Sequence, residues 1–425
     1  MDRPTVTLCM IVKDETHIIE QCLRSMAKYV DRYDITDTGS TDGTQDLIKK
    51  VMDELEVSGT VHQSDWKGFG DVGDKMGSRT ESFRNAEKSG CDYAWVIDAD
   101  DYIEGKFTYP DNFGSADAYA LKMGRGEFTW WRNQIFKLSE GWKYVGVLHE
   151  YATTDKPREE MVYDKINDDK YRLVARTEGN RNIGITVIEK YTRDAETILE
   201  AMEIEPDNTR YMFYLAQSYF DSQQWEKAIE WYAKRANAGG WPEEVYYSRL
   251  RIGILCGILK KPEEEFVKAM LDCWNGKPDR AEPLWFLARY YRMNNKPALG
   301  YIYARIASEI PYPKNDILFV HGDVYEWTVM DELAATAYYA MKPHVGYNAA
   351  KILLESKSVP PEHRSRVEDN FKSYSELLQH IHGQEESSRM QEEQNKKEEK
   401  VKRANRIKKS TKSPSKTGYK KRTKV

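Results

Sequence analysis

Short apolar runs alternate with helical patterns in the first hundred residues, and this alternation constrains the fold more than any other feature. The runs lie at 5–12, 33–36 and 93–97. Between the first two, Ile18, Cys22, Met26 and Val30 recur at four-residue intervals, as on one face of a helix. Helical patterns at 46–55 and 79–89 precede the third run. Strands that alternate with helices predict a parallel sheet with crossover helices, so we expect an α/β domain here.

Acidic residues follow two of these runs. Asp37 comes after the second run, and Asp98, Asp100 and Asp101 come after the third. In sheets of this kind ligands bind beyond the carboxyl ends of the strands. Clustered carboxylates repel one another and favour a cation, and hard oxygen ligands favour Mg²⁺ or Mn²⁺, which bridge carboxylates to phosphates. A DxD triplet alone is common on acidic surfaces, but its place at a strand end predicts a metal and phosphate site.

Beyond about residue 190 the pattern becomes helical and rich in Tyr, Trp and Ala. The segment 211–219, followed by Ala228 and Tyr232, fits the helix pair of a tetratricopeptide repeat. Ala288 is echoed 34 residues later by Gly322, which is the period of that repeat. We expect three or four degenerate repeats, whose aromatic stripes mainly pack between helices and whose concave face offers a surface for an acceptor.

The formal net charge of −5 hides an asymmetry. Residues 401–425 hold eleven Lys or Arg and no acid, so the remainder carries −16. An acidic body is a poor nucleic-acid binder. From 383 onward apolar residues nearly vanish, which predicts a charged, basic, disordered tail at 383–425. Within it, a helix that continues over the mixed-charge stretch 384–400 stays an alternative, whereas 402–425 is expected to be disordered. An anionic partner of this tail, either nucleic acid or a membrane surface, stays an alternative to a purely solvated segment.

The prediction of the cellular location depends on segments for membrane crossing and secretion. No apolar run approaches the roughly 20 residues that cross a bilayer, and the apolar run at 6–12 is too short for a signal peptide. The five cysteines form no CxxC pair, which predicts buried free thiols. We therefore expect a cytoplasmic protein, in the host cytoplasm if the source is a virus.

Six segments, in this order, carry a resemblance to a known family: CMIVKDE at 9–15, DTGSTDGT at 37–44, FRNA at 83–86, DADD at 98–101, RNQIF at 132–136 and GVLHE at 146–150. The chain resembles family 2 inverting glycosyltransferases that carry tetratricopeptide-like repeats, as found in bacteria and large DNA viruses. FYLAQSY at 213–219 and GGWPEE at 239–244 extend the resemblance, which covers about 4–355. It implies a GT-A catalytic domain at 1–180, an all-α repeat domain at 181–382 and the tail at 383–425.

The resemblance also implies roles for individual residues. The donor nucleotide would contact Lys13, Glu15, Asp37, Thr38, Arg79, Arg84 and Asp98. Asp100 and His149 would hold the Mn²⁺ or Mg²⁺ ion, and Glu150 would act as the base that an inverting transfer needs. Many relatives have an acid where this chain has Thr38, and many carry their base in a Glu-Asp pair that is absent here. These departures leave the nucleotide and the base open.

Together these features predict an enzyme, a hexosyl- or pentosyltransferase. It would move a sugar from a nucleotide-diphosphate donor, for which we expect a UDP-sugar, to a hydroxyl of a glycan or protein acceptor held by the helical repeats. The alternative from another class is a catalytically inactive repeat scaffold that binds nucleotide or protein partners.

Overall fold

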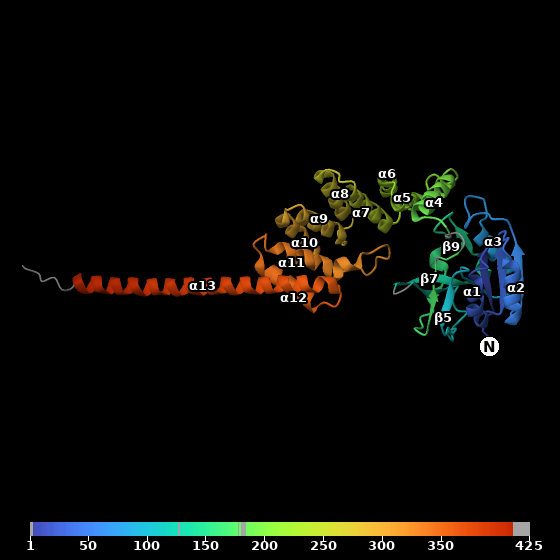
Figure 1. The fold of residues 1–425 in the computed structure, drawn as a ribbon, viewed down its shortest axis with the longest axis horizontal. Helices are drawn as coiled ribbons and strands as arrows, with labels where there is room; N and C mark the ends of the chain where they lie inside the picture. Colours follow the sequence, from blue (N-terminus) through green and yellow to red (C-terminus); the bar gives the residue numbers. More distant parts are fainter. Residues whose placement is uncertain (1–2, 126–127, 177, 180–183, 411–425) are drawn as a thin grey trace, which may run out of the picture. The chain divides into compact units, whose positions relative to one another are not determined.

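The computed structural model describes residues 3–125, 128–176, 178–179 and 184–410 (Figure 1). The chain divides into two compact units, Met1–Ser248 and Arg249–Val425. The division falls inside helix α7 (Pro242–Ile258). The predicted boundary between residues 180 and 181 lies outside the described residues and stays a prediction, as does the boundary at 382.

The first unit is built on a sheet that has nine strands among the described residues, in the order β3-β2-β1-β4-β7-β6-β11-β5, with β10 paired to β6. The strands are β1 (Val6–Val12), β2 (Arg32–Asp37), β3 (Gly59–Gln63), β4 (Tyr93–Val96), β5 (Tyr102–Gly105), β6 (Ala118–Arg125), β7 (Phe128–Lys137), β10 (Tyr163–Lys165) and β11 (Tyr171–Val174). A separate hairpin joins β8 (Lys143–Val145) to β9 (Tyr151–Thr153).

The half of the sheet formed by β3, β2, β1 and β4 is parallel, as the alternation predicted. Its crossover helices are α1 (Ile19–Met26), α2 (Thr44–Glu54) and α3 (Ser78–Glu87). The sequence analysis did not predict the edge strand β3, because GTVHQ is half-exposed and contains no apolar run. Beyond β4 the sheet is mixed: β7 pairs antiparallel with both β4 and β6, whereas β10 and β11 pair parallel with β6.

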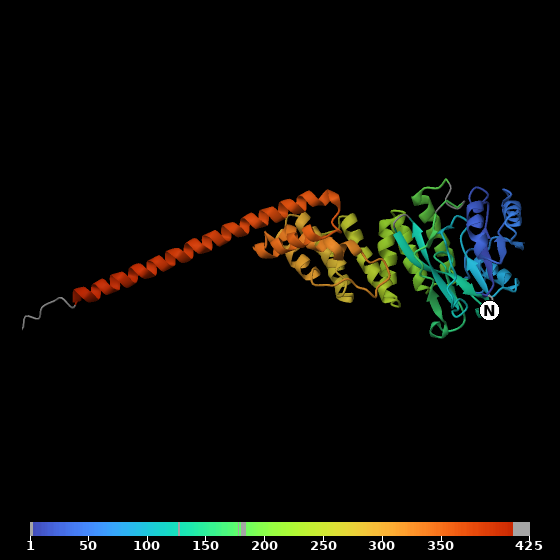
Figure 2. The same cartoon turned by 90° about the horizontal axis from the view of Figure 1, so that it is seen from below.

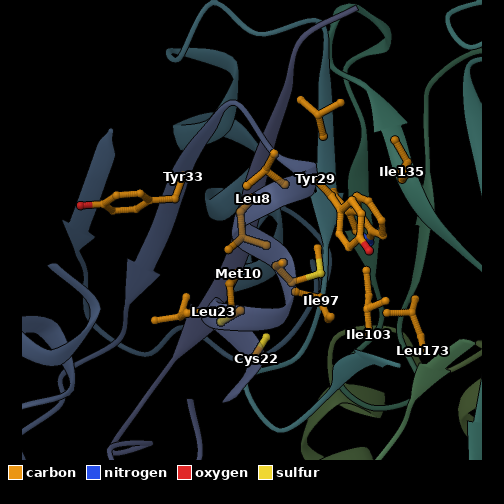
Figure 3. Packing of buried hydrophobic residues seen from close by; sticks show 14 of the residues in the cluster. Leu8, Met10, Cys22, Leu23, Tyr29, Tyr33, Ile97, Ile103, Ile135 and Leu173 are labelled. Atoms are coloured by element: carbon orange, nitrogen blue, oxygen red, sulfur yellow. The ribbon is translucent and has the colours of Figure 1, made fainter. Parts of the chain in front are cut away.

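Hydrophobic cores lie on both faces of this sheet. Alternate side chains of β1 point to opposite faces. Leu8 and Met10 pack with Cys22 and Leu23 of α1 (Figure 3), whereas Cys9 packs in a second cluster with Phe83 of α3. A strand buried on both faces reads as a continuous apolar run, which explains the signal at 5–12. The mixed α/β class is confirmed, and its assignment as a GT-A domain stays a prediction.

Helices follow the sheet within the first unit. They are α4 (Val187–Met202), α5 (Thr209–Asp221) and α6 (Trp225–Asn237), and each packs on the next. Thr186 and Glu189 form a reciprocal capping box at the start of α4, and the Asn208 side chain accepts from the first amides of α5. These caps fix where both helices begin.

All the regular elements of the second unit are helical among its described residues. It contains α8 (Glu263–Gly276), α9 (Glu282–Met293), α10 (Pro297–Ala307), the π-helical turn η5 (Val324–Thr328), α11 (Val329–Ala337), α12 (Pro343–Glu355) and α13 (Pro361–Ser410). Close glycine contacts hold its helices together, because Gly300 of α10 lies against the Ala288 carbonyl and Gly346 of α12 against the Tyr374 ring.

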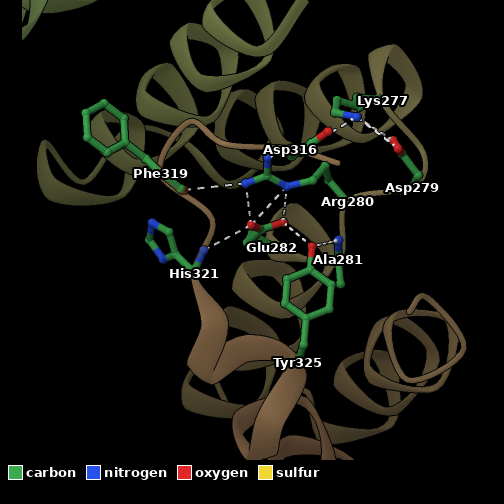
Figure 4. A network of polar contacts seen from close by, with 9 residues as sticks. All are labelled: Lys277, Asp279, Arg280, Ala281, Glu282, Asp316, Phe319, His321 and Tyr325. Carbon is green, nitrogen blue, oxygen red and sulfur yellow. Dashed lines mark hydrogen bonds and ion pairs between the residues drawn. The ribbon is translucent and has the colours of Figure 1, made fainter. Parts of the chain in front are cut away.

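The 34-residue echo of Ala288 by Gly322 is wrong as a structural period. Ala288 is buried inside α9, whereas Gly322 precedes η5. The corresponding helix starts are Pro297 of α10 and Pro343 of α12, which are 46 positions apart (343 − 297). A long connection between α10 and η5 lengthens this repeat, and Arg280 anchors it by donating to Asp316 and to the Phe319 carbonyl (Figure 4).

Helix α13 includes the stretch 384–400, where a helix was the alternative, and corrects the predicted disorder of residues 402–410. It runs without interruption to Ser410 in both views (Figures 1 and 2), so residues 383–410 are helical. The reason is composition, because Glu, Gln, Lys and Arg are good helix formers. Ion pairs between residues one turn apart, Glu392 with Lys396 and Glu398 with Lys402, stabilise the helix slightly further. The rest of the predicted tail, 411–425, lies outside the described residues.

Two further predictions concern membrane-spanning helices and the state of the cysteines. Within the described ranges no helix combines the length and the apolarity that crossing a bilayer requires. The cysteines are free thiols, as predicted, and all are buried except the half-buried Cys91.

Candidate active site

A cavity of about 530 Å³ opens at the carboxyl ends of β1, β2, β4 and β11. Six of the residues predicted to bind donor or metal line it: Lys13, Glu15, Thr38, Arg79, Asp98 and Asp100. Its other lining residues are Ile11, Val12, Trp66, Phe69, Ala99, Arg176 and Gly179. The structure therefore gathers most of the predicted site in one place, at the edge of the sheet where the topology predicted it.

The loops after β1 and β2 brace each other. The Asp14 amide donates to Ser40 Oγ at 2.9 Å, and Asp14 Oδ1 accepts from the Thr41 amide at 2.7 Å. The Glu15 amide donates to Thr44 Oγ1 at 2.8 Å. These bonds hold the loop that presents Lys13 and Glu15 to the cavity.

Asp37, the last residue of β2, and Thr38, which follows it, make different contacts. Asp37 Oδ1 accepts from the amides of Gly39 and Ser40 and from the side chain of Gln45, while the buried Oδ2 has no hydrogen-bond partner among the described residues. Asp37 is absent from the cavity lining. Thr38 lines the cavity and donates its hydroxyl proton to the Val12 carbonyl at 3.0 Å. Toward a ligand, the Thr38 hydroxyl therefore offers lone pairs rather than a proton.

The three acids after β4 differ in environment. Burial raises the pKa of Asp98, but the guanidinium groups of Arg79 and Arg132 lower it more, so its pKa lies well below the usual value. Burial, assisted by the Asp98 charge, raises the pKa of Asp100 and brings that of Asp101 to about 8. Asp98 is thus neutralised by protein cations, whereas Asp100 faces the cavity with excess negative charge.

Arg79 connects the floor of the cavity to the β8–β9 hairpin. Its guanidinium donates to Asp98 Oδ1 at 2.7 Å, and its Nε lies 2.6 Å from Glu150 Oε1. The Glu150 side chain is only 12% exposed, so this ion pair orients a largely buried carboxylate. Arg132 approaches the other oxygen of Asp98 at 3.4 Å. Arg79 therefore joins Glu150, the predicted base, to Asp98, which is predicted to contact the donor nucleotide.

Besides Asp37 and Glu150, two more of the predicted residues, Arg84 and His149, are absent from the cavity lining. Arg84 pairs with Glu87 and donates to the carbonyls of Gly141 and Trp142. The His149 ring stacks on Tyr214 of α5, with centroids 3.9 Å apart and planes 8° from parallel. Their donor and metal roles stay predictions.

Sequence reasoning missed three residues of the cavity. Arg176 donates from Nε to the Asp100 carbonyl at 2.6 Å, and its buried Nη2 has no hydrogen-bond partner among the described residues. Trp66 and Phe69 meet edge to face at 4.8 Å. The DWKGFG segment at 65–70, with aromatic residues in a glycine-containing loop after β3, was a signal for the second pair, but nothing in the sequence set Arg176 apart from its neighbours.

The donor set of the cavity fits a divalent cation shared with a phosphate. Glu15 Oε1 and Asp100 Oδ2 lie 3.4 and 3.5 Å from the point that a Cβ on Gly179 would occupy, so a side chain there would meet both carboxylates. No group of three His, Cys, Asp or Glu side chains within the described ranges is arranged to hold a metal. Mg²⁺ is usually bound by one or two carboxylates together with substrate phosphates, and the Glu15–Asp100 pair suits that mode.

No protein-family model matches this chain. Similar curated proteins include the glycosyltransferase SunS of Bacillus phage SPbeta and the SPbeta prophage-derived SunS of Bacillus subtilis (strain 168), each 23% identical over 250 residues. The match covers 56% of this chain and 54% of each relative, so the chain spans about half the length of the curated relatives it matches. The chain is thus distantly similar to glycosyltransferases.

Solved structures similar to this chain include BtubC and a TPR protein, YrrB. BtubC (BKLC) from P. vanneervenii is 13% identical with a TM-score of 0.35, and covers 56% of this chain and 96% of its own. YrrB, a TPR protein with an unusual peptide-binding site, is 11% identical with a TM-score of 0.29, and covers 40% of this chain and 78% of its own. Both TM-scores are too low to assign a fold.

Proposed function

We propose that the chain is a metal-dependent, inverting glycosyltransferase that moves a sugar from a nucleotide-diphosphate donor to an acceptor hydroxyl. The observation that carries this proposal is the cavity at the strand carboxyl ends, where the Glu15 and Asp100 carboxylates lie beside the cations of Lys13 and Arg176. A diphosphate and its counterion need both kinds of group. The distant similarity to glycosyltransferases named SunS supports the same class.

The nucleobase would lie beside Thr38 and the aromatic pair Trp66 and Phe69. Because the Thr38 hydroxyl proton is engaged by Val12, the side chain accepts a hydrogen bond from the ligand. Uracil has an imide N–H that can donate here, whereas the corresponding nitrogen of cytosine is itself an acceptor. This difference supports a UDP-sugar over a CDP-sugar, whereas thymine and guanine also carry a ring N–H that can donate here.

The metal would lie between Asp100 and Glu15 and act as a Lewis acid on the leaving diphosphate. Arg176, whose Nη2 has no hydrogen-bond partner in the described part of the chain, would donate to a phosphate oxygen by a charge-assisted hydrogen bond. Asp98 is paired with Arg79 and Arg132, so it would contact the donor as a neutralised hydrogen-bond acceptor rather than as a metal ligand.

Glu150 is our proposed base for the acceptor hydroxyl. An inverting transfer needs a carboxylate on the side of the sugar opposite the leaving group. Arg79 orients the Glu150 carboxylate beside the cavity, and the hairpin that carries it does not belong to the loops proposed to bind the nucleotide. The acceptor, a glycan or a protein, would approach from this side.

The test is thermal unfolding of the full chain with UDP-, GDP-, CDP- and dTDP-sugars, with Mn²⁺ and then with EDTA. A ligand that binds only the folded state raises the melting temperature by mass action. We expect a shift with a UDP-sugar that EDTA removes. Asp100→Asn should abolish this shift without lowering the melting temperature of the free protein, because it removes a charge that burial and Asp98 already disfavour.

The matched control is Asp155→Asn, which removes an exposed carboxylate paired with Lys143 outside the cavity. It should leave the ligand-induced shift intact. A metal-dependent shift that survives Asp100→Asn would overturn the metal assignment. If no donor shifts the wild-type protein, the inactive scaffold becomes the better description.

A further inference from the structure

We propose that helix α5 is a positioning element of the active site: Arg210 and Tyr214 hold the hairpin turn that carries His149 and Glu150. The inference rests on the proposed function, because it gives the helical part that follows the sheet a role in the same transfer. It begins with the turn between β8 and β9, residues 146–150, which α5 contacts through two side chains one helical turn apart.

Both contacts act on His149. The Tyr214 ring stacks on the imidazole at 3.9 Å, and Arg210 Nη2 donates to the His149 carbonyl at 2.8 Å. The side chain and the main chain of one residue are thus held by the same face of α5. Glu150, the next residue, cannot move far while His149 is fixed at both points.

Arg210 is itself held in place. Its guanidinium lies over the rings of Tyr151 and Tyr214, at 5.1 and 4.9 Å from their centroids. It also approaches Glu244 at 3.9 Å, and Glu244 pairs at 2.8 Å with the fully buried Arg235. The Arg210 side chain that contacts the turn is therefore held near the buried ion pair of Glu244 and Arg235.

The backbone of the turn requires outside support. His149 has φ of +53°, the left-handed region that non-glycine residues seldom adopt. Such a conformation persists only where surrounding contacts impose it, and it is common at functional sites. The stack with Tyr214 and the bond from Arg210 are the contacts that impose it here.

The turn transmits its position to the cavity by two routes. Glu150 lies 2.6 Å from Arg79, which lines the cavity and pairs with Asp98. On the other side, Gly70 and Gly146 approach so closely that a Cβ on Gly70 would lie 2.7 Å from the Gly146 carbonyl oxygen. Gly70 follows Phe69 of the cavity wall. Arg210 and Tyr214 are absent from the lining, so they act through these residues rather than on a ligand.

The test compares Tyr214→Leu and Arg210→Gln with Tyr214→Phe in the full chain. We expect amide hydrogen exchange of the 146–151 peptide to rise at least tenfold in the first two variants and to stay near wild type in Tyr214→Phe, which keeps the stacked ring. With UDP and Mn²⁺, the Kd should change less than threefold in all three. The kcat for transfer should fall at least tenfold in Tyr214→Leu and Arg210→Gln only.

Tyr219→Leu is the matched control, because Tyr219 lies on the same helix beneath Lys227 and, among the described residues, makes no hydrogen bond or ring contact with the turn. It should lower the melting temperature without raising exchange at 146–151. Unchanged exchange in Tyr214→Leu would overturn the inference, and so would faster exchange with an unchanged kcat, since the contact would then be only structural. If the wild-type protein binds no nucleotide, the proposed function fails, while the exchange data still decide whether α5 holds the turn.

Discussion

A single guanidinium group serves two carboxylates in the candidate active site. Arg79 is buried, which lowers the pKa of an arginine, but Asp98 and Glu150 raise it more, so its pKa lies above the usual value. Arg79 therefore stays charged at any pH the protein meets. The two carboxylates depend on it, because an acid buried without its cation loses several kcal/mol of stabilisation.

At the same scale, we predict that Arg176→Gln weakens donor binding. Arg176 lines the cavity, and its buried Nη2 has no hydrogen-bond partner in the described part of the chain. Because this nitrogen is proposed to donate to phosphate, the substitution removes a charge-assisted hydrogen bond. We expect the Kd for UDP with Mn²⁺, measured by calorimetry, to rise by at least tenfold.

The comparison variant is Arg172→Gln on β11, four residues before Arg176, whose side chain pairs with the exposed Glu104. Its Kd should stay within twofold of wild type. Equal losses in both variants would mean that the effect comes from general charge and not from a contact to phosphate.

The sequence predicts the residues of the site that directly follow apolar strands, but not those that depend on contacts between segments far apart in the sequence. Lys13, Glu15, Thr38 and Asp98 follow apolar strands directly, so the topology rule alone places them together. Arg176 reaches the cavity only because β11 joins the sheet between β6 and β5, and no local pattern indicates that pairing. The same applies to the contact of His149 with Tyr214, which joins residues 65 positions apart (214 − 149).

At the scale of elements, the helical unit is stabilised by a buried ionic network. Arg280 and Glu282 are both fully buried, and their closest oxygen and nitrogen lie 2.6 Å apart (Figure 4). Tyr325 of η5 also donates to Glu282, at 2.7 Å. The network therefore ties the start of α9 to the segment that follows the long connection after α10.

We predict that Glu282→Gln lowers the free energy of unfolding of the helical unit by about 2 kcal/mol. The substitution replaces charge-assisted hydrogen bonds from the buried Arg280 by neutral ones, while Asp316 still compensates the arginine charge. Scanning calorimetry of the full chain would measure the loss. Glu264→Gln, at an exposed position of α8, should change stability by less than about 0.5 kcal/mol. Similar values for both would contradict a stabilising role for the network.

The same glutamate gives a pH dependence. Burial raises the pKa of Glu282, but hydrogen bonds and charge from Arg280 lower it more, so its folded pKa is below the usual value. Its contribution is therefore present above the unfolded pKa of about 4.3 and is lost as the pH falls through the folded pKa. Between pH 6 and pH 3, the melting temperature of the helical unit should fall more in the wild type than in Glu282→Gln.

The elements that the sequence failed to predict share a physical reason. Strand β3 is held by main-chain bonds to β2 and buries little apolar surface, so it lacks a hydrophobic signature. The 46-residue spacing of α10 and α12 arises from a connection fixed by the Arg280 network, which involves side chains distant in sequence. Apolar periodicity indicates how one element packs. It predicts neither an edge strand held by main-chain bonds nor a connection held by distant side chains.

At the scale of the whole molecule, catalysis should depend on the first unit and not on the end of the chain. We predict that removing residues 401–425 leaves the Kd for UDP and the kcat within twofold of wild type. The described side chains of 401–404 and 406 are exposed on α13 and add no buried area to a core. Kinetics with a small soluble acceptor would measure this. A fivefold or larger loss would show that the basic segment takes part in the reaction.

The left-handed turn at His149 has a consequence for synthesis of the protein. The sheet closes with β11, which ends at Val174, but Arg210 and Tyr214 emerge from the ribosome only later. Amino-terminal domains generally begin to fold during translation. A nascent chain would therefore complete its sheet while the turn still lacks the helix that supports it, and an unfinished polypeptide would carry a nucleotide cavity with its proposed base unplaced. Catalysis would begin only after α5 has been made and has folded against the turn.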